Sequence, residues 1–255
     1  MRRFLAAIRF LTILPLPGAR GTAEADLAGS TPFFPVVGFV LGTGGAAVAW
    51  TLSLATPPLV TSAVIVILLV SFSGGLHMDG LSDTADGFFS SEPRARILEI
   101  MRDSQIGAMG VMAVVGVLLV KFAALASLPP ADLWRAVFLI PLAGRSALVV
   151  QMAVLRSIRP NGLGALFSKA RPRLSAICAV AVLALAGWAV AGTCGLGAAS
   201  LCVLTALGFA RYCYWKIGGA TGDTYGAGCE IAEIVPALTF AVWPVPLGGL
   251  WRAAT

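Results

Sequence analysis

Residues 33–54 read FFPVVGFVLGTGGAAVAWTLSL, an apolar run that contains no charged side chain. A helix needs about 20 such residues to cross the hydrocarbon core of a bilayer. Six more apolar runs follow, and turn residues such as Pro57-Pro58 and Pro129-Pro130 separate neighbours. The seven predicted spans are Phe33–Leu54, Leu59–Ser73, Gly107–Leu125, Arg135–Leu155, Leu174–Ala191, Leu196–Ala210 and Ile231–Leu250. The sequence therefore predicts an all-α, polytopic membrane helix bundle that forms one domain over residues 1–255.

The composition excludes most other classes of protein. Hydrophobic residues make up 58% of the 255 residues and charged residues 12%, with a mean hydropathy of +0.90. A soluble domain usually carries about 25% charged residues. The chain is therefore too apolar for an ordinary soluble enzyme and for a disordered protein. The five cysteines form no CxxC pair and predict neither a zinc site nor a disulfide framework, and a single histidine excludes a multi-histidine metal site.

The basic residues predict how the bundle is oriented. The first eleven residues could suggest a signal peptide, but Arg9 interrupts the apolar run, and Pro15 and Pro17 stand where a cleavage site should lie. We expect an interfacial helix there instead. With the N-terminus in the cytoplasm, the basic residues expected inside are Arg2, Arg3, Arg9, Arg20, Arg94, Arg96, Arg102, Arg156, Arg159, Lys169, Arg171, Arg173, Arg211 and Lys216. Those expected outside are Lys121, Arg135 and Arg252.

This asymmetry predicts a cytoplasmic N-terminus and an external C-terminus. The net charge of +6 is then explained by cytoplasmic loops, so nucleic acid is not an expected partner.

Acidic side chains gather in two stretches, and the first reads GGLHMDGLSDTADG over residues 74–87. On a helix, Asp79, Asp83 and Asp86 share an arc of about 60°. Carboxylates in this arrangement repel one another, and a bound Mg²⁺ would remove the repulsion. The alternative is a solvated face at the cytoplasmic end of the second span. His77 would point away from Asp79, which favours a structural or proton-handling role.

A short helix with Arg94 and Arg96 is predicted next, and it extends through Arg102 and Asp103. Arginines beside a carboxylate-bound metal suit a pyrophosphate substrate, whereas the alternative is an amphipathic helix whose arginines meet lipid headgroups. Arg145 lies within the fourth span, where it could either bind a substrate phosphate or extend to the membrane surface.

The second acidic stretch covers residues 218–233 and is rich in glycine. It contains Asp223, followed by Glu230 and Glu233 on one helix face. Glu233 is expected just inside the last span, where an ionised group is costly. If both stretches belong to one site, the second and last spans must be neighbours.

Several of these stretches resemble the cobalamin synthase family of adenosylcobinamide-GDP ribazoletransferases. They are residues 74–87, Met101–Gly107, Gly219–Asp223, Phe10–Pro17 and Asn161–Gly164. They occur in the family's order over nearly the whole chain.

The resemblance implies a Mg²⁺-dependent enzyme of the bacterial inner membrane, with its active site on the cytoplasmic face. The enzyme would join adenosylcobinamide-GDP to α-ribazole, or its 5′-phosphate, and release GMP. A homodimer is left open. The expected roles are metal binding by Asp79, Asp83 and Asp86, and catalysis by Asp103 and Asp223. Substrate binding is expected of Arg102, Ser104, Arg145, Gly219, Thr221, Glu230 and Glu233.

Two other functions are compatible with parts of the pattern. The sequence Asp83-Thr84-Ala85-Asp86-Gly87 resembles the opening of the CDP-alcohol phosphotransferase signature, but Ser90-Ser91 replaces the Ala-Arg that should follow. A cation-coupled transporter would also place acids among spans. Its site would lie near the bilayer midplane, whereas these acids are predicted at one membrane face.

Overall fold

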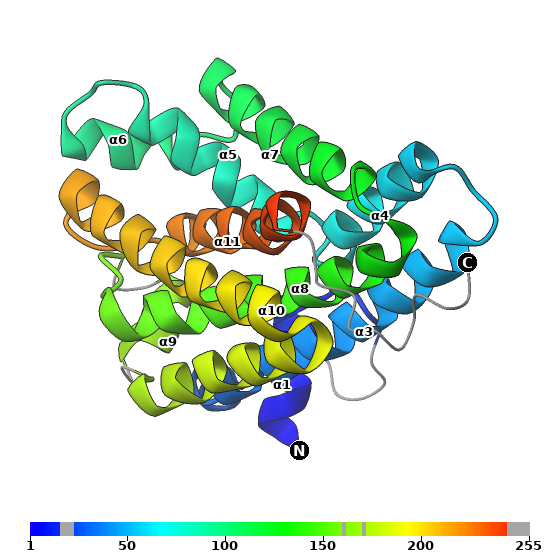
Figure 1. The fold of residues 1–255 in the computed structure, drawn as a ribbon. Helices are drawn as coiled ribbons and strands as arrows, with labels where there is room; N and C mark the ends of the chain where they lie inside the picture. The colour runs from blue at the N-terminus through cyan, green and yellow to red at the C-terminus, as the bar shows by residue number, and fades with distance from the viewer. Residues whose placement is uncertain (16–22, 160–161, 170–171, 244–255) are drawn as a thin grey trace.

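The structure, a computed structural model, describes residues 1–15, 23–159, 162–169 and 172–243, and in this part of the chain all regular elements are helices (Figure 1). The α-helices are α1 Arg2–Leu11, α2 Glu24–Ala28, α3 Phe34–Ser53, α4 Pro58–Phe72, α5 Leu76–Phe88, α6 Arg94–Ile100, α7 Ala108–Ala126, α8 Pro130–Val154, α9 Leu163–Lys169, α10 Arg173–Ile217 and α11 Gly222–Val242. A 3-10 turn, Thr31–Phe33, precedes α3. The predicted all-α fold class is confirmed.

The helices match most of the predicted spans in place, and the predicted number of about seven is approximate. Five described helices are long and apolar enough to cross a membrane, and the bent pair α4 and α5 makes six if the pair is one span. The 45-residue α10 consists of two arms, because Gly192 has φ +55° and breaks the helix. Gly187 and Gly195 pack backbone to backbone across this turn, which only a residue without a side chain allows. Counted as two arms, α10 supplies the fifth and sixth predicted spans.

Two predictions about the last span and about Lys121 are wrong. The predicted span Ile231–Leu250 corresponds to α11, which begins nine residues earlier, at Gly222, and ends at Val242. The prediction left the polar residues at the start of α11 outside the span, but in the structure they belong to the helix and face other helices rather than lipid. Lys121 is predicted among the external basic residues, at the outer end of the span Gly107–Leu125, but in α7 it is completely buried. Residues 244–250, Arg20, Asn161, Arg171 and Arg252 lie outside the described residues.

A sharp break separates the acidic stretch from the second span. Gly74 and Gly75 have φ values of +61° and +79°, which glycine adopts without strain, and α5 leaves α4 at an angle of 88°. The three aspartates therefore lie on a helix of their own, rather than at the end of α4. This corrects the expectation that the second span carries them.

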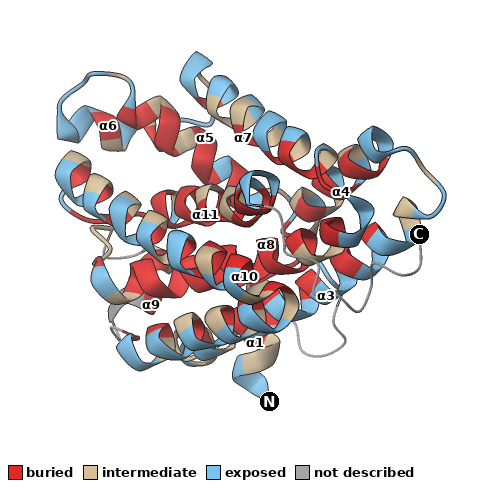
Figure 2. Ribbon diagram, in the orientation of Figure 1, coloured by how far each residue is buried: buried red, intermediate tan, exposed pale blue. Residues whose placement is uncertain are grey.

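Helix α8 forms the centre of the bundle (Figure 2). Of its most apolar stretch, 89% is buried, compared with 22% for α7 and 28% for α10. Gly38 and Gly42 of α3 allow the close approach to α8, since a Cβ on Gly38 would lie 2.7 Å from the carbonyl oxygen of Pro141 and one on Gly42 would lie still closer to that of Phe138. The exposed apolar faces of α7 and α10 have the character of lipid-facing surface.

Candidate active site

The site is built where α5 crosses α11. A Cβ on Gly80 would lie 2.7 Å from the carbonyl oxygen of Asp223, and one on Gly226 would lie 3.3 Å from the Cα atom of His77. The two glycines therefore let the helix backbones touch. The crossing brings together two stretches that are about 140 residues apart in the sequence, and it confirms that the helices carrying the two acidic stretches are neighbours.

Four aspartates share this crossing. Asp83 lies close enough to Asp79, Asp86 and Asp223 to be repelled by the negative charge of each, and Arg159 is the cation that opposes this repulsion. Asp79 is exposed, whereas Asp83 and Asp86 are half-buried. The arrangement concentrates negative charge at one place and favours a cationic ligand.

Asp86 also has a structural contact that the sequence did not predict. Its two carboxylate oxygens accept hydrogen bonds from the backbone N–H groups of Gly107 and Gly110, each at 2.8 Å. These N–H groups belong to the first turn of α7, where the helix itself offers them no acceptor. Asp86 therefore caps α7 and holds it against α5.

Asp223 is held by a cation and by a helix cap. Nη1 of Arg159 donates to Oδ2 of Asp223 at 2.8 Å, and the Thr221 hydroxyl donates to the same oxygen at 3.3 Å. Nη2 of Arg159 also donates to the carbonyl oxygen of Met101 at 3.4 Å. Arg159 thus joins α11 to the end of α6. The sequence predicts Arg159 only as a basic loop residue, although it stands two residues before the Asn161–Gly164 stretch.

Gly219 and Thr221 shape the backbone that presents Asp223. Thr221 is the N-cap of α11, and it exchanges side-chain-to-backbone hydrogen bonds with Thr224 in a capping box. A Cβ on Gly219 would lie 2.8 Å from the carbonyl oxygen of Arg156. Ala220 forms an isolated bridge with Ser157. These contacts give both predicted substrate-binding residues a structural part in the site.

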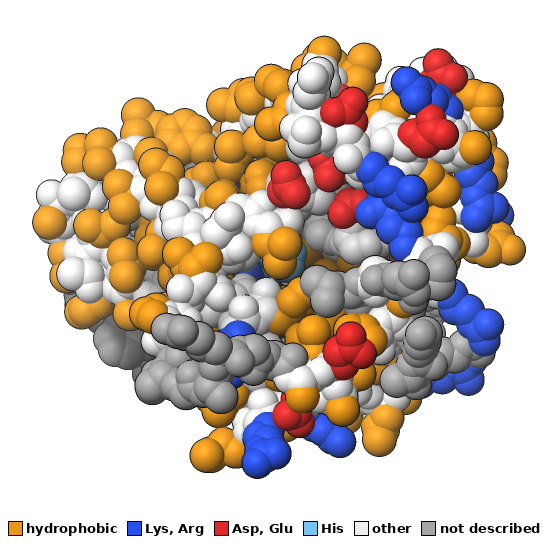
Figure 3. All heavy atoms as spheres, turned by 180° about the vertical axis from the view of Figure 1, so that it is seen from behind, with side chains coloured by type: hydrophobic (Ala, Val, Ile, Leu, Met, Phe, Trp, Pro, Cys, Tyr) orange, Lys and Arg blue, Asp and Glu red, His pale blue; other side chains and the backbone are white. Residues whose placement is uncertain are grey.

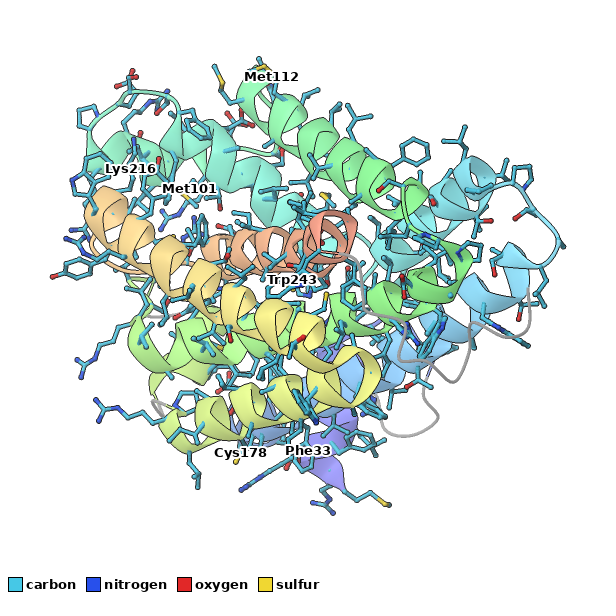
Figure 4. The ribbon with its side chains drawn as sticks, in the orientation of Figure 1. Phe33, Met101, Met112, Cys178, Lys216 and Trp243 are labelled. Carbon is cyan, nitrogen blue, oxygen red and sulfur yellow. The ribbon has the colours of Figure 1, made fainter. Side chains whose placement is uncertain are left out.

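The loop after α6 carries three more residues that the sequence predicts to be part of the active site. The helix ends at Ile100, so Arg102 and Asp103 lie beyond it rather than on it, and both are exposed together with Ser104. Oδ1 of Asp103 accepts a hydrogen bond from the backbone N–H of Gln105 at 3.0 Å. Figure 3 shows many of the acidic and basic side chains gathered at one end of the molecule, with a further group along its lower edge, and hydrophobic side chains over much of the opposite end. Met101 and Lys216 mark the charged end in Figure 4.

A second group of charges lies deeper, in the middle of the bundle. Nζ of Lys121 donates to Oε2 of Glu230 at 2.6 Å and to Oε2 of Glu233 at 2.8 Å. Arg145 pairs with the other oxygen of Glu233. All four side chains are at most 4% exposed. We call these four residues the buried ion cluster; it joins α7, α8 and α11.

The buried ion cluster corrects the prediction that Glu230 and Glu233 accompany Asp223 at the membrane face. At 1.5 Å per residue, Glu230 lies about 10 Å and Glu233 about 15 Å along α11 from Asp223. Arg145 is paired with a carboxylate, and the structure does not extend it to the membrane surface. None of these ion pairs is predicted from the sequence, because Lys121 and Arg145 lie far from Glu230 and Glu233 along the chain.

Two cavities open beside the four aspartates. The outer cavity has a volume of about 820 Å³ and lies between the end of α1, the α4–α5 break and α7. The inner cavity has a volume of about 240 Å³ and lies between α5, α8, α9 and α11. Asp79 lines both cavities, as do Phe10 and Leu76. Arg159 and Asp223 line the inner cavity.

The carboxylates fit a hard divalent cation by their chemistry. Mg²⁺ prefers one or two carboxylates together with water and substrate phosphates. Asp79, Asp83 and Asp223 offer such oxygens, and their mutual repulsion gives a reason for a cation. In the described part of the chain, no three acidic, histidine or cysteine side chains are gathered closely enough to hold a metal by themselves. This is compatible with a site that substrate phosphates complete.

The fold and the site together define a polytopic helical protein with a carboxylate-rich site at one end of its bundle. The sequence model of one family, described as Cobalamin-5-phosphate synthase, matches residues 3–241. The chain belongs to this family.

The chain is similar in sequence to several proteins over most of their lengths. An adenosylcobinamide-GDP ribazoletransferase of Roseiflexus sp. (strain RS-1) is 43% identical over 238 residues, which cover 92% of this chain and 88% of the relative. The protein of the same name from Geotalea daltonii is 34% identical over 249 residues, 98% of this chain and 99% of the relative. That from Stutzerimonas stutzeri is 36% identical over 238 residues, 91% and 95% of the two chains. No solved structure matches the chain.

Proposed function

We propose that the protein is an adenosylcobinamide-GDP ribazoletransferase that acts late in cobalamin biosynthesis. The family membership and the names of its relatives support the activity. The single observation that links this activity to the site is the convergence of four aspartates where α5 crosses α11: Asp79, Asp83, Asp86 and Asp223. The relatives reported above share the transferase name, which gives no support to the alternatives of a CDP-alcohol phosphotransferase or a transporter.

The reaction joins two substrates through one phosphorus. A ribose hydroxyl of α-ribazole, or of its 5′-phosphate, would attack the pyrophosphate phosphorus on the cobinamide side. A new P–O bond forms, the bridging P–O bond breaks, and GMP leaves with the bond electrons. The hydroxyl proton must pass to a base. We assign this role to Asp223, because it lines the inner cavity and its partner Arg159 can remain beside the developing charge.

Mg²⁺ is the cofactor that we propose, with Asp79 and Asp83 among its ligands. The bound ion would neutralise charge on the pyrophosphate and on departing GMP. Asp86 would act mainly through α7, since both of its oxygens already accept backbone hydrogen bonds. Arg102, Asp103 and Ser104 lie on the loop that leads to Ile106 in the outer cavity, from which they would reach the nucleotide.

We also propose that the charged end of the bundle faces the cytoplasm and that the bundle lies in the bacterial inner membrane. Loops rich in arginine and lysine favour that side. Arg94 and Gly218 are in contact there, so the loops before α6 and before α11 share one end.

The test is GMP release by the purified full-length protein in nanodiscs, given both substrates and Mg²⁺. We expect one GMP for each corrinoid joined, none when either substrate is omitted, and loss of activity with EDTA that Mg²⁺ reverses. Turnover that persists in EDTA would contradict the metal assignment, and an absence of corrinoid product with Mg²⁺ present would contradict the function.

A further inference from the structure

The two cavities differ in size and in most of their lining, although Phe10, Leu76 and Asp79 line both. The outer cavity is more than three times the volume of the inner one. Much of its wall is apolar, and two of its residues on α7, Val111 and Val115, are about half exposed. It therefore opens along the face of the bundle and can take a large ligand that extends beyond the protein.

The inner cavity combines an aromatic end with a polar end. Phe10 and Phe167 form a wall with their ring centroids 5.0 Å apart, and Met152 lies on the same cavity. Arg159 and Asp223 line its other side. A flat base beside a hydroxylated sugar has the same division, since aromatic side chains stack on a base and charged groups bind hydroxyls.

His77 supplies an independent sign of a ligand in the inner cavity. His77 is one of the residues that line this cavity, and it is only 3% exposed. Its Nε2 atom has no hydrogen-bond partner among the described residues. Buried polar atoms are almost always paired, so an unpaired one beside a cavity indicates where a ligand atom belongs.

We infer that the inner cavity binds the acceptor nucleoside, with His77 as a hydrogen-bonding residue for it, while the outer cavity binds the nucleotide-linked corrinoid donor. This inference rests on the proposed function. The base of α-ribazole would stack against Phe10 and Phe167, and its ribose would lie toward Asp223. The donor pyrophosphate would then lie at Asp79, which lines both cavities, so the attacking hydroxyl and the attacked phosphorus meet at their junction.

One variant in each cavity tests separately which substrate that cavity binds. The protein is the full chain in nanodiscs, and the ligand is α-ribazole titrated by calorimetry without donor. His77→Leu should raise its Kd and its KM about tenfold, the loss expected for one buried hydrogen bond. His77→Gln should recover most of this loss, because its amide reaches the position of Nε2. The KM of the donor should stay within about twofold of the parent value in both variants, which also shows that they are folded.

The matched variant is Val111→Trp, which fills part of the outer cavity from the surface of α7. We expect a higher KM for the donor and an unchanged Kd for α-ribazole. The inference is overturned if His77→Leu weakens both substrates equally or neither, or if Val111→Trp weakens α-ribazole. A parent protein that releases no GMP would instead refute the proposed function, so the two failures are distinguishable.

Discussion

At the scale of single residues, the four aspartates have unequal contacts and should respond differently to neutral replacement. Asp79→Asn and Asp83→Asn should each abolish turnover and leave the melting temperature unchanged, because neither carboxylate holds another element. Asp223→Asn should lower kcat by about 10²–10⁴-fold, as for a lost general base. Asp86→Asn should lower both kcat and the melting temperature, because an amide oxygen replaces only one of the two oxygens that cap α7.

The control for these variants is Glu99→Gln on α6. Glu99 pairs with Arg96 at the surface, with 61% of each side chain exposed, and such pairs contribute little to stability. GMP release and thermal unfolding in detergent measure both properties. Parent-like activity in any two of the Asp79, Asp83 and Asp223 variants would remove the carboxylates from catalysis.

At the scale of elements, the crossing of α5 and α11 depends on Gly80. Gly80→Ala would place a methyl group 2.7 Å from the backbone oxygen of Asp223, so the helices must separate and the aspartates with them. Overpacking of this kind costs about 1–3 kcal/mol. We expect a lower melting temperature and a large loss of GMP release. Gly116→Ala on α7 is the matched control, because nothing lies within 4 Å of the added methyl group. Equal behaviour of the two variants would contradict the contact.

The buried ion cluster joins three elements and is neutral as a whole, with two cations and two carboxylates. Glu233→Gln would leave Arg145 without its partner, which for buried pairs costs about 3–5 kcal/mol. Lys121→Met should be similarly harmful, because it leaves the Glu230 carboxylate unpaired.

The double variant Lys121→Met with Glu230→Gln restores neutrality, and we expect it to unfold at a higher temperature than either single variant. Additive losses would show that charge balance does not hold α7 against α11.

At the scale of the whole molecule, the distribution of charge predicts the orientation in the membrane. Single cysteines near Arg94 and Lys216, in a background without the five native cysteines, should react with a membrane-impermeant reagent only after cells are opened. Cysteines near Pro58 and Pro130 should react in intact cells. Labelling near Arg94 in intact cells would place the aspartates on the outer side and refute the cytoplasmic site.

Most of the helices and the acidic face of α5 follow from local features of the sequence. Apolar runs bounded by proline and glycine fix where spans begin and end, because a helix in lipid must satisfy its own backbone hydrogen bonds. The spacing of Asp79, Asp83 and Asp86 places them on one face through local geometry alone. The break at Gly192 falls in the gap between the predicted spans Leu174–Ala191 and Leu196–Ala210.

Which charges meet depends on how the helices pack, and local sequence does not predict it. Lys121 could be an end-of-span cation or a buried partner, and the choice depends on α11 lying beside α7, across more than a hundred residues of sequence. Glu230 and Glu233 follow Asp223 closely along the chain, yet they serve a different cluster, because the rise of a helix moves them 10–15 Å away from the site. The Arg159–Asp223 ion pair and the two cavities likewise form only when separate helices pack. Ion pairing and the shape of a binding site depend on distance in space and not on distance in sequence.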